Sequence, residues 1–203
     1  MPTIVVPFRG EGAKLRLAPI EPPVRRELAL AMLGDVLAAC HATGPTTIVT
    51  DDADAAELAR PLVAEVLPDP GHGQGAAVAA ALARIDPGPT LVVNADVPCV
   101  VPHDLRTLLA AAPPDGFALV QASDGTTNAL GLPRPELFRP LYGPGSAHRF
   151  RRHAESLGVD AVPAAIPNLA DDVDTLADLR RLQLRVGPRT HAALARLGPR
   201  LAA

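Results

Sequence analysis

The sequence predicts an α/β fold, in which helices flank a mostly parallel mixed sheet within a single domain, residues 1–203. Short apolar runs alternate with longer amphipathic stretches over most of the length, which is typical of strands joined by crossover helices. A chain of 203 residues is long enough for one substantial core and too short for two large domains. No repeat, linker or low-complexity tract divides it.

The apolar runs are predicted to be strands. The run that ends at Val93 has the unbroken hydrophobicity of a strand covered on both faces. Because helical patterns separate successive runs, most of the strands should run parallel to one another. The predicted strands cover residues 3–8, 46–50, 65–67, 90–93, 117–122, 129–132 and 159–162.

The helices are predicted from apolar periodicity and from their end signals. The longest begins at a proline pair and places an apolar face from Leu28 to Ala39. The acids at 51–52 are expected to cap the next helix, and Thr175 with Asp178 forms a capping-box pattern. The predicted helices cover residues 22–42, 53–62, about 74–85, 102–112, 148–153, 176–184 and 188–197.

Composition excludes several classes of function. The formal charge of −3 offers no basic footprint for nucleic acid. No apolar run approaches the roughly 18 residues of a membrane span, and the N-terminus lacks the pattern of a signal peptide. We therefore expect a cytoplasmic protein that binds neither nucleic acid nor membrane. Cys40 and Cys99 lack a metal-ligand spacing, and both are expected to be buried thiols without a disulfide.

One carboxylate stands where α/β folds bind ligands. Asp96 follows directly after the predicted buried strand 90–93, and ligands of open α/β sheets sit at the carboxyl ends of strands. A metal or a phosphate-bearing ligand is one interpretation of this residue. The other is that Asp96 only turns the chain before Pro98.

Three further carboxylates lie late in the chain. Asp171, Asp172 and Asp174 form an acidic run just before the predicted helix 176–184. The capping box explains Thr175 but leaves these acids without a role.

Three glycine-containing segments are candidates for anion binding. The loop 9–16 carries Lys14, which is the only lysine among 18 arginines, and Arg16; it matches neither the dinucleotide fingerprint nor the Walker loop. Gly73 and Gly75 open an alanine-rich helix, whose free N–H groups suit a phosphate or nucleotide. A tight turn for close packing is the alternative there.

The third segment is a glycine turn that leads to Ser146 and a basic helix. Ser146 stands at a helix N-cap position, where its hydroxyl and the nearby N–H groups would bind an anion. The alternative is that Ser146 only caps the helix while the arginines that follow it are solvated.

Together these segments resemble the guanylyltransferase family of coenzyme F-420 biosynthesis. The most specific matches are 127–130 (Thr-Asn-Ala-Leu), 142–146 (Tyr-Gly-Pro-Gly-Ser) and 172–175 (Asp-Val-Asp-Thr) with 177–179 (Ala-Asp-Leu). The tail 186–190 is similar to the actinobacterial branch, whose members use phosphoenolpyruvate; the archaeal branch is associated with 2-phospho-L-lactate. The resemblance covers nearly the whole chain and implies a nucleotidyltransferase fold, which is glycosyltransferase-A-like and Rossmann-like.

The resemblance implies joining of GMP from GTP to phosphoenolpyruvate, with release of pyrophosphate, by a monomer or homodimer. Asp96 and Asp174 would hold Mg²⁺, and Lys14 would be catalytic with them while contacting the nucleotide. Arg16, Gly73 and Gly75 would complete the nucleotide site. Thr127, Gly143 and Ser146 would hold phosphoenolpyruvate, with the two hydroxyls as anchors for its two anionic ends.

The sequence departs from the family pattern in several places. Leu15 replaces a hydroxyl residue in the first loop, and Gly73-Gln74-Gly75 stands where the family has Gly-Leu-Asn, so that an asparagine expected near the nucleotide is missing. Val97 in place of leucine and Leu176 in place of proline are milder changes. Two alternatives follow from this. One is a related nucleotidyltransferase acting on 2-phospho-L-lactate, 3-phosphoglycerate or another phosphorylated small molecule. The other is a nucleotide-binding protein without catalytic activity.

Overall fold

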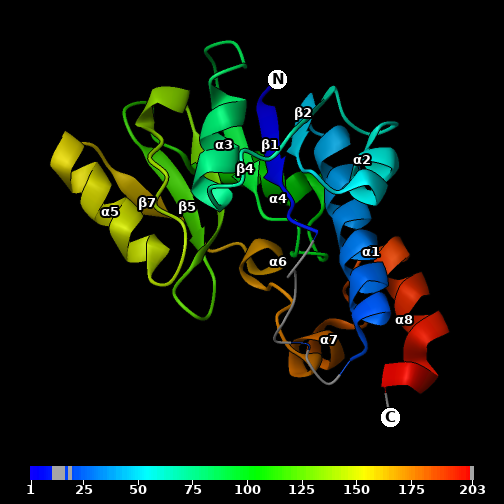
Figure 1. Ribbon diagram of the computed structural model, residues 1–203. Helices are drawn as coiled ribbons and strands as arrows, with labels where there is room; N and C mark the ends of the chain where they lie inside the picture. Colours follow the sequence, from blue (N-terminus) through cyan, green and yellow to red (C-terminus); the bar gives the residue numbers. More distant parts are fainter. Residues whose placement is uncertain (11–16, 18–19, 202–203) are drawn as a thin grey trace.

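A computed structural model describes residues 1–10, 17 and 20–201, and in these ranges it contains a seven-stranded sheet with helices on both faces (Figure 1). The strands are β1 (Thr3–Pro7), β2 (Thr46–Val49), β3 (Glu65–Leu67), β4 (Thr90–Val93), β5 (Phe117–Gln121), β6 (Thr127–Leu132) and β7 (Ala161–Pro163). Their order is β3-β2-β1-β4-β6-β5-β7. Only β6 among them runs antiparallel to its neighbours, so the predicted mostly parallel sheet is confirmed.

The helices largely follow the predicted order. They are α1 (Pro22–His41), α2 (Ala53–Ala59), α3 (Gln74–Leu82), α4 (Pro102–Ala111), α5 (Ser146–Leu157), α6 (Pro167–Ala170), α7 (Leu176–Leu182) and α8 (Pro188–Leu201), with a 3₁₀ turn at Pro135–Leu137. Helix α5 runs beyond the predicted end at 153 until Gly158 adopts a left-handed conformation. The 3₁₀ turn and α6 were not predicted, because each is too short to show a period.

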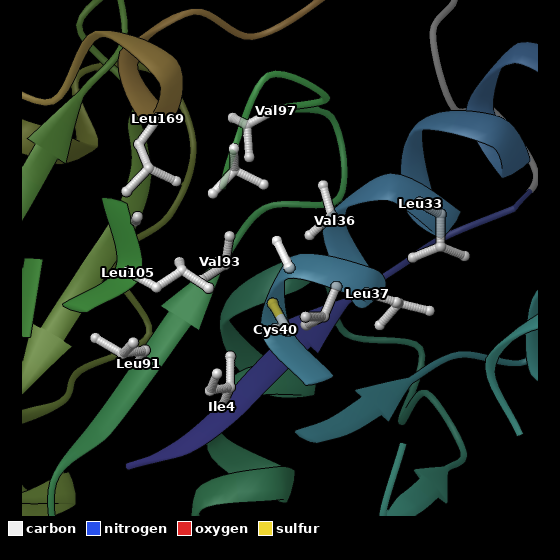
Figure 2. Close-up of a cluster of buried hydrophobic side chains, with 14 of the residues drawn as sticks. Ile4, Leu33, Val36, Leu37, Cys40, Leu91, Val93, Val97, Leu105 and Leu169 are labelled. Atoms are coloured by element: carbon white, nitrogen blue, oxygen red, sulfur yellow. The ribbon is translucent and has the colours of Figure 1, made fainter. Parts of the chain in front are cut away.

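Alternate residues of the central strands pack into separate layers. Ile4 and Leu91 face α1, α2 and α4, whereas Val5 and Val92 face α3 and α5. Figure 2 shows the first of these layers, where side chains of α1 such as Leu37 pack against β1 and β4. Both faces of the central strands are therefore buried, which explains their unbroken hydrophobicity.

A third apolar cluster joins the start of α1 to α7 and α8, and includes Met32 and Val173. Beside it, the buried carboxylate of Asp35 on α1 accepts hydrogen bonds from the backbone N–H groups of Arg189 (3.0 Å) and Thr190 (2.8 Å). Asp35 thus satisfies free donors at the first turn of α8 and fixes this helix against α1. The C-terminal segment is thereby held beside the loop that follows β4.

The cysteines are buried and unbonded to each other, as expected. Burial raises the pKa of the Cys40 thiol to about 12, so this side chain packs as a small apolar group. Within the described ranges, no helix combines the length and the hydrophobicity that crossing a membrane requires.

Candidate active site

Three aspartates from two loops meet beyond the carboxyl end of β4. Asp96, Asp172 and Asp174 each contribute a carboxylate oxygen to this cluster, and the three oxygens lie within 4.8 Å of one another. All three residues are half-buried. Like charges this close together repel, and oxygen ligands of this kind are what Mg²⁺ prefers. The donor set therefore fits a magnesium ion.

Backbone contacts bring the two acidic loops together. The N–H of Val173 donates to the carbonyl oxygen of Asp96 at 3.0 Å, and the Val173 side chain is fully buried in the third apolar cluster. Because neighbouring side chains of an extended segment point to opposite sides, burial of Val173 directs Asp172 and Asp174 the other way. The acidic segment ends at Thr175, which forms the predicted capping box with Asp178.

Asp171 has a different role from the acids that follow it. It accepts hydrogen bonds from Arg181 (2.5 Å) and Arg185 (2.7 Å) on the exposed side of the segment. Partial burial favours a higher pKa for this carboxyl, but the bonds from Arg181 and Arg185 outweigh it and hold the pKa below its usual value. Asp171 thus stays charged and holds the acidic segment against α7.

A first cleft of about 300 Å³ lies on one side of the acidic cluster, over the ends of β1 and β4. Its lining combines apolar and polar side chains. It is lined by Pro7, Phe8, Arg9, Ala29, Met32, Asp69, Gln74, Ala77, Asn94, Ala95, Asp96 and Asp174.

A second cleft of about 560 Å³ lies on the other side, toward β6 and the start of α5. Most of its lining residues are polar. The lining consists of Gln74, Asn94, Asp96, Asp124, Thr126, Thr127, Asn128, Tyr142, Gly143, Pro144, Ser146, Asp172 and Asp174. The two clefts share Gln74, Asn94, Asp96 and Asp174, and therefore meet at the acidic cluster.

Thr127 and Ser146 come together in the second cleft as a bonded pair. The Ser146 hydroxyl donates to Thr127 Oγ1 at 3.1 Å, and both residues are almost fully buried. The expectation that these two hydroxyls anchor the two anionic ends of a small acid stays a prediction. The N-cap position predicted for Ser146 is wrong: Gly145 is the N-cap, and Ser146 is the first helical residue.

Arg149 holds the turn that carries Gly143. Its guanidinium donates to the backbone carbonyl oxygens of Leu141 (2.9 Å), Tyr142 (3.0 Å) and Pro144. Gly143 has φ 111°, a conformation that residues with a Cβ rarely adopt. In the alternative interpretation of this helix its arginines were solvated, but Arg149 instead donates to the backbone of the turn through the fixed fork of its guanidinium.

The residues that were predicted to bind the nucleotide fall in two groups. Gly73 and Gly75 flank the start of α3, but the residue between them, Gln74, is the one that lines both clefts. A Cβ on Gly75 would lie 2.7 Å from Pro140 Cβ, which supports the close-packing interpretation of this glycine. Lys14 and Arg16 lie outside the described residues.

Sequence comparison identifies the family. Residues 2–195 match the profile described as "Guanylyl transferase CofC like". The chain belongs to this family. It is 39% identical to a phosphoenolpyruvate guanylyltransferase of Nocardia farcinica, covering 94% of the chain and 88% of that protein. A protein of the same name from Streptomyces coelicolor is 40% identical over 96% of both chains.

Solved structures support the fold of this CofC-like chain. A nucleotidyl transferase from Methanothermobacter superposes with a TM-score of 0.66 at 17% identity, over 97% of this chain and 99% of that one. A 4-diphosphocytidyl-2C-methyl-D-erythritol synthase superposes with a TM-score of 0.61 at 16% identity, over 90% and 97%. At these identities the likeness concerns the fold alone, and the predicted nucleotidyltransferase fold is confirmed.

Several cleft residues escaped the sequence analysis of this CofC-like chain. Asp172 was noted as an acid without a role. The Asp-x-Asp pattern that it forms with Asp174 was the signal in the sequence that could have identified it. Gln74 and Asn94 carry no motif of their own, because their position between two clefts depends on the sheet order. Asp69 follows the short strand β3 and likewise shows no local pattern.

Proposed function

We propose that this protein joins GMP from GTP to phosphoenolpyruvate, releasing pyrophosphate, as a step of coenzyme F-420 biosynthesis. The observation that carries the proposal is the similarity to phosphoenolpyruvate guanylyltransferases over nearly the full chain, 39–40% identity in the two relatives above. The geometry is compatible with two substrates, because two clefts of different character meet at one acidic cluster. The cytoplasmic location and the state of monomer or homodimer stay predictions.

The first cleft is assigned to GTP. Its apolar walls, which include Phe8, Ala29 and Met32, suit the faces of a purine. The edge of guanine carries two adjacent N–H donors beside a carbonyl oxygen, and Asp69 with Arg9, which both line this cleft, would offer the complementary carboxylate and guanidinium. The Asp69 side chain is only 10% exposed, so a bond from guanine would be sheltered from water.

The second cleft is assigned to phosphoenolpyruvate. A three-carbon acid with a phosphate and a carboxylate has almost no apolar surface, and most of the residues that line this cleft are polar. The hydroxyl pair of Thr127 and Ser146 would contact one anionic group. The turn at Gly143, which Arg149 fixes, would present its backbone to the same ligand.

The reaction itself requires positioning more than acid–base chemistry. An oxygen of the phosphoenolpyruvate phosphate attacks the α-phosphorus of GTP, a new P–O bond forms, and the bond to the bridging oxygen of pyrophosphate breaks. The attacking oxygen is already anionic at neutral pH, so no general base is needed. The protein must hold two anions in line and neutralise their charge.

Asp96 and Asp174 are proposed as magnesium ligands, with Asp172 as a third carboxylate beside them. A bound magnesium ion would neutralise phosphate charge from both substrates and orient them. Lys14 and Arg16 are proposed to neutralise the triphosphate, and the N–H groups at Gly73 and Gly75 to contact the nucleotide.

The test is a matrix of nucleotides against phosphorylated acids, with the products identified by mass spectrometry. We expect the phosphoenolpyruvate–GMP adduct and stoichiometric pyrophosphate from GTP and phosphoenolpyruvate with Mg²⁺. A product only with 2-phospho-L-lactate or 3-phosphoglycerate would assign the chain to a related transferase. Binding of GTP without any pyrophosphate release across the whole matrix would mean that the protein is not a transferase.

A further inference from the structure

We propose that Asp35 is a positioning residue for the acidic cluster: it anchors the segment 186–190 against α1, and this segment holds the loop that carries Asp96. The inference rests on the magnesium site of the proposed function and deepens it. It also gives a role to the tail 186–190, whose likeness to the family the two clefts do not explain, because none of these residues lines either cleft.

Two backbone hydrogen bonds from the C-terminal part of the chain hold the loop that follows β4. The carbonyl oxygen of Asp96 accepts from the N–H of Val173 at 3.0 Å, and the carbonyl oxygen of Pro98 accepts from the N–H of Gly187 at 2.8 Å. The position of Asp96 relative to the other two acids of the cluster therefore depends on where the segment 173–187 lies.

Asp35 is the polar anchor of this segment. Its carboxylate lies on α1, is 5% exposed, and accepts the backbone N–H groups of Arg189 at 3.0 Å and Thr190 at 2.8 Å. A Cβ on Gly187 would lie 2.4 Å from Cγ of Asp35, so the chain passes close to the carboxyl group at a point where only glycine fits. Asp35 thus contacts both the start of α8 and the residue that bonds the Asp96 loop.

The apolar contacts around this anchor would not specify the placement by themselves. Cys99 of the loop and Val173 belong to the third apolar cluster, together with side chains of α7 and α8. Apolar contacts have no direction, whereas a buried carboxylate bonded to two N–H groups has one favourable position. A metal ion held by oxygens at about 2 Å would respond to a displacement of Asp96 by about 1 Å. Asp35 should therefore matter for metal binding as well as for stability.

The test measures metal binding by the folded protein, with Mn²⁺ as the probe for the magnesium site and the free ion followed by electron paramagnetic resonance. Asp35→Asn keeps the size of the side chain, but its NH₂ group accepts no hydrogen bond, so one of the two backbone donors loses its partner. We expect the affinity for Mn²⁺ to fall by about tenfold or more. The Mg²⁺ concentration that half-saturates pyrophosphate release should rise in parallel.

Arg189→Pro and Arg189→Ala form a matched pair that leaves the carboxylate in place. Both remove the exposed side chain of Arg189, but only proline also removes the N–H that Asp35 accepts. Proline is tolerated in the first turn of a helix, and α1 itself begins with Pro22 and Pro23. Arg189→Pro should weaken Mn²⁺ binding, whereas Arg189→Ala should bind Mn²⁺ within about twofold of wild type.

Ile48→Ala controls for a general loss of stability. Ile48 is a fully buried residue of β2 that lines neither cleft, so its truncation lowers the thermal midpoint without altering a contact of the Asp96 loop. All variants are measured well below their thermal midpoints, where each is folded. Ile48→Ala should therefore retain the wild-type affinity for Mn²⁺.

The outcomes separate the role of Asp35 from the function on which it rests. If folded Asp35→Asn binds Mn²⁺ as the wild type does, Asp35 only stabilises the fold and the inference is wrong; should this variant not fold, Arg189→Pro decides in the same way. An equal loss of affinity in Ile48→Ala, or a wild type that binds no Mn²⁺, would also overturn the inference. If metal binding depends on Asp35 but the wild type makes no guanylylated acid, the proposed function fails and the role of Asp35 at the metal site stands.

Discussion

The two clefts differ in what their walls can recognise. The lining of the first includes apolar side chains such as Phe8 and Met32 beside its charged groups. The second is lined by hydroxyls, amides, carboxylates and a glycine turn. Apolar walls favour the binding of any flat ring, whatever the orientation of its polar edge. Hydrogen bonds, in contrast, select a ligand with one arrangement of donors and acceptors.

This difference indicates how one protein can hold two anionic substrates side by side without either substrate occupying the cleft of the other. A small acid gains little from the first cleft, and a purine would leave the polar groups of the second unsatisfied. The shared residues, with Asp96 and Asp174 among them, lie only where the clefts meet. Changes at the junction should therefore affect catalysis with both substrates, and changes in one cleft should affect one substrate.

The largest effect is expected at the junction. Asp96→Asn, Asp172→Asn and Asp174→Asn each remove one carboxylate charge from a cluster whose oxygens lie within 4.8 Å of one another. Turnover at fixed Mg²⁺ should fall by about a hundredfold or more, since a magnesium ion binds through such charges. Magnesium titrations of pyrophosphate release provide the measurement. Near wild-type turnover of any one variant at saturating Mg²⁺ would remove that residue from the set of ligands.

A smaller effect, on one substrate only, is expected at the hydroxyl pair. Thr127→Val or Ser146→Ala should weaken phosphoenolpyruvate binding by about tenfold to hundredfold, the equivalent of about 1.5–3 kcal/mol for a hydrogen bond to a charged group. Because the hydroxyls are 3.1 Å apart, the double variant should lose less than the sum of both. Isothermal titration calorimetry measures each ligand separately. Fully additive losses would show that the hydroxyls act at separate points.

In the first cleft we expect a loss of discrimination between nucleotides. Asp69→Asn keeps the size of the side chain but can no longer accept two N–H bonds from the guanine edge. The preference for GTP over ITP, which lacks the amino group of guanine, should fall by about tenfold. Competition between the two nucleotides in one reaction measures the ratio. An unchanged ratio would mean that Asp69 does not contact the base.

The smallest effect is expected outside both clefts. Asp171→Asn breaks exposed ion pairs with Arg181 and Arg185, so turnover should be unchanged and the thermal midpoint should fall by about 2–4 °C or less. The folded-state pKa of Asp171 lies below its usual value of 3.8. Its stabilisation is therefore present above pH 3.8 and is lost as the pH falls through the folded-state pKa. Melting curves at pH 7 and pH 3 should show a difference between variant and wild type that is smaller at pH 3.

Local signals were sufficient to predict most of the fold. The limits of β3 and β4 were predicted correctly because β-branched and apolar runs are bounded there by turn residues. The capping box at Thr175 likewise depends on a spacing of three residues. That residues 1–203 form a single domain stays a prediction.

The candidate site could be predicted only in part. Asp96, Asp174, Thr127, Gly143 and Ser146 were recognised from short motifs, and the structure places all of them around the second cleft. The positions of Gln74 and Arg149 depend instead on partners that the fold supplies. Gln74 forms a hydrogen bond with Asn94, 20 positions further along the chain. Arg149 donates hydrogen bonds to backbone carbonyl oxygens, which every type of residue carries. No local pattern encodes either contact.

The most direct test of the two-cleft account is a crossed kinetic measurement on Asp69→Asn and Ser146→Ala. The KM for each substrate is determined in each variant while the other substrate is saturating. The account predicts that Asp69→Asn raises only the KM for GTP and Ser146→Ala raises only the KM for phosphoenolpyruvate, by about tenfold each, with the other two values within about twofold of wild type. If the effects are exchanged, or if both variants raise the same KM, the assignment of one substrate to each cleft is wrong.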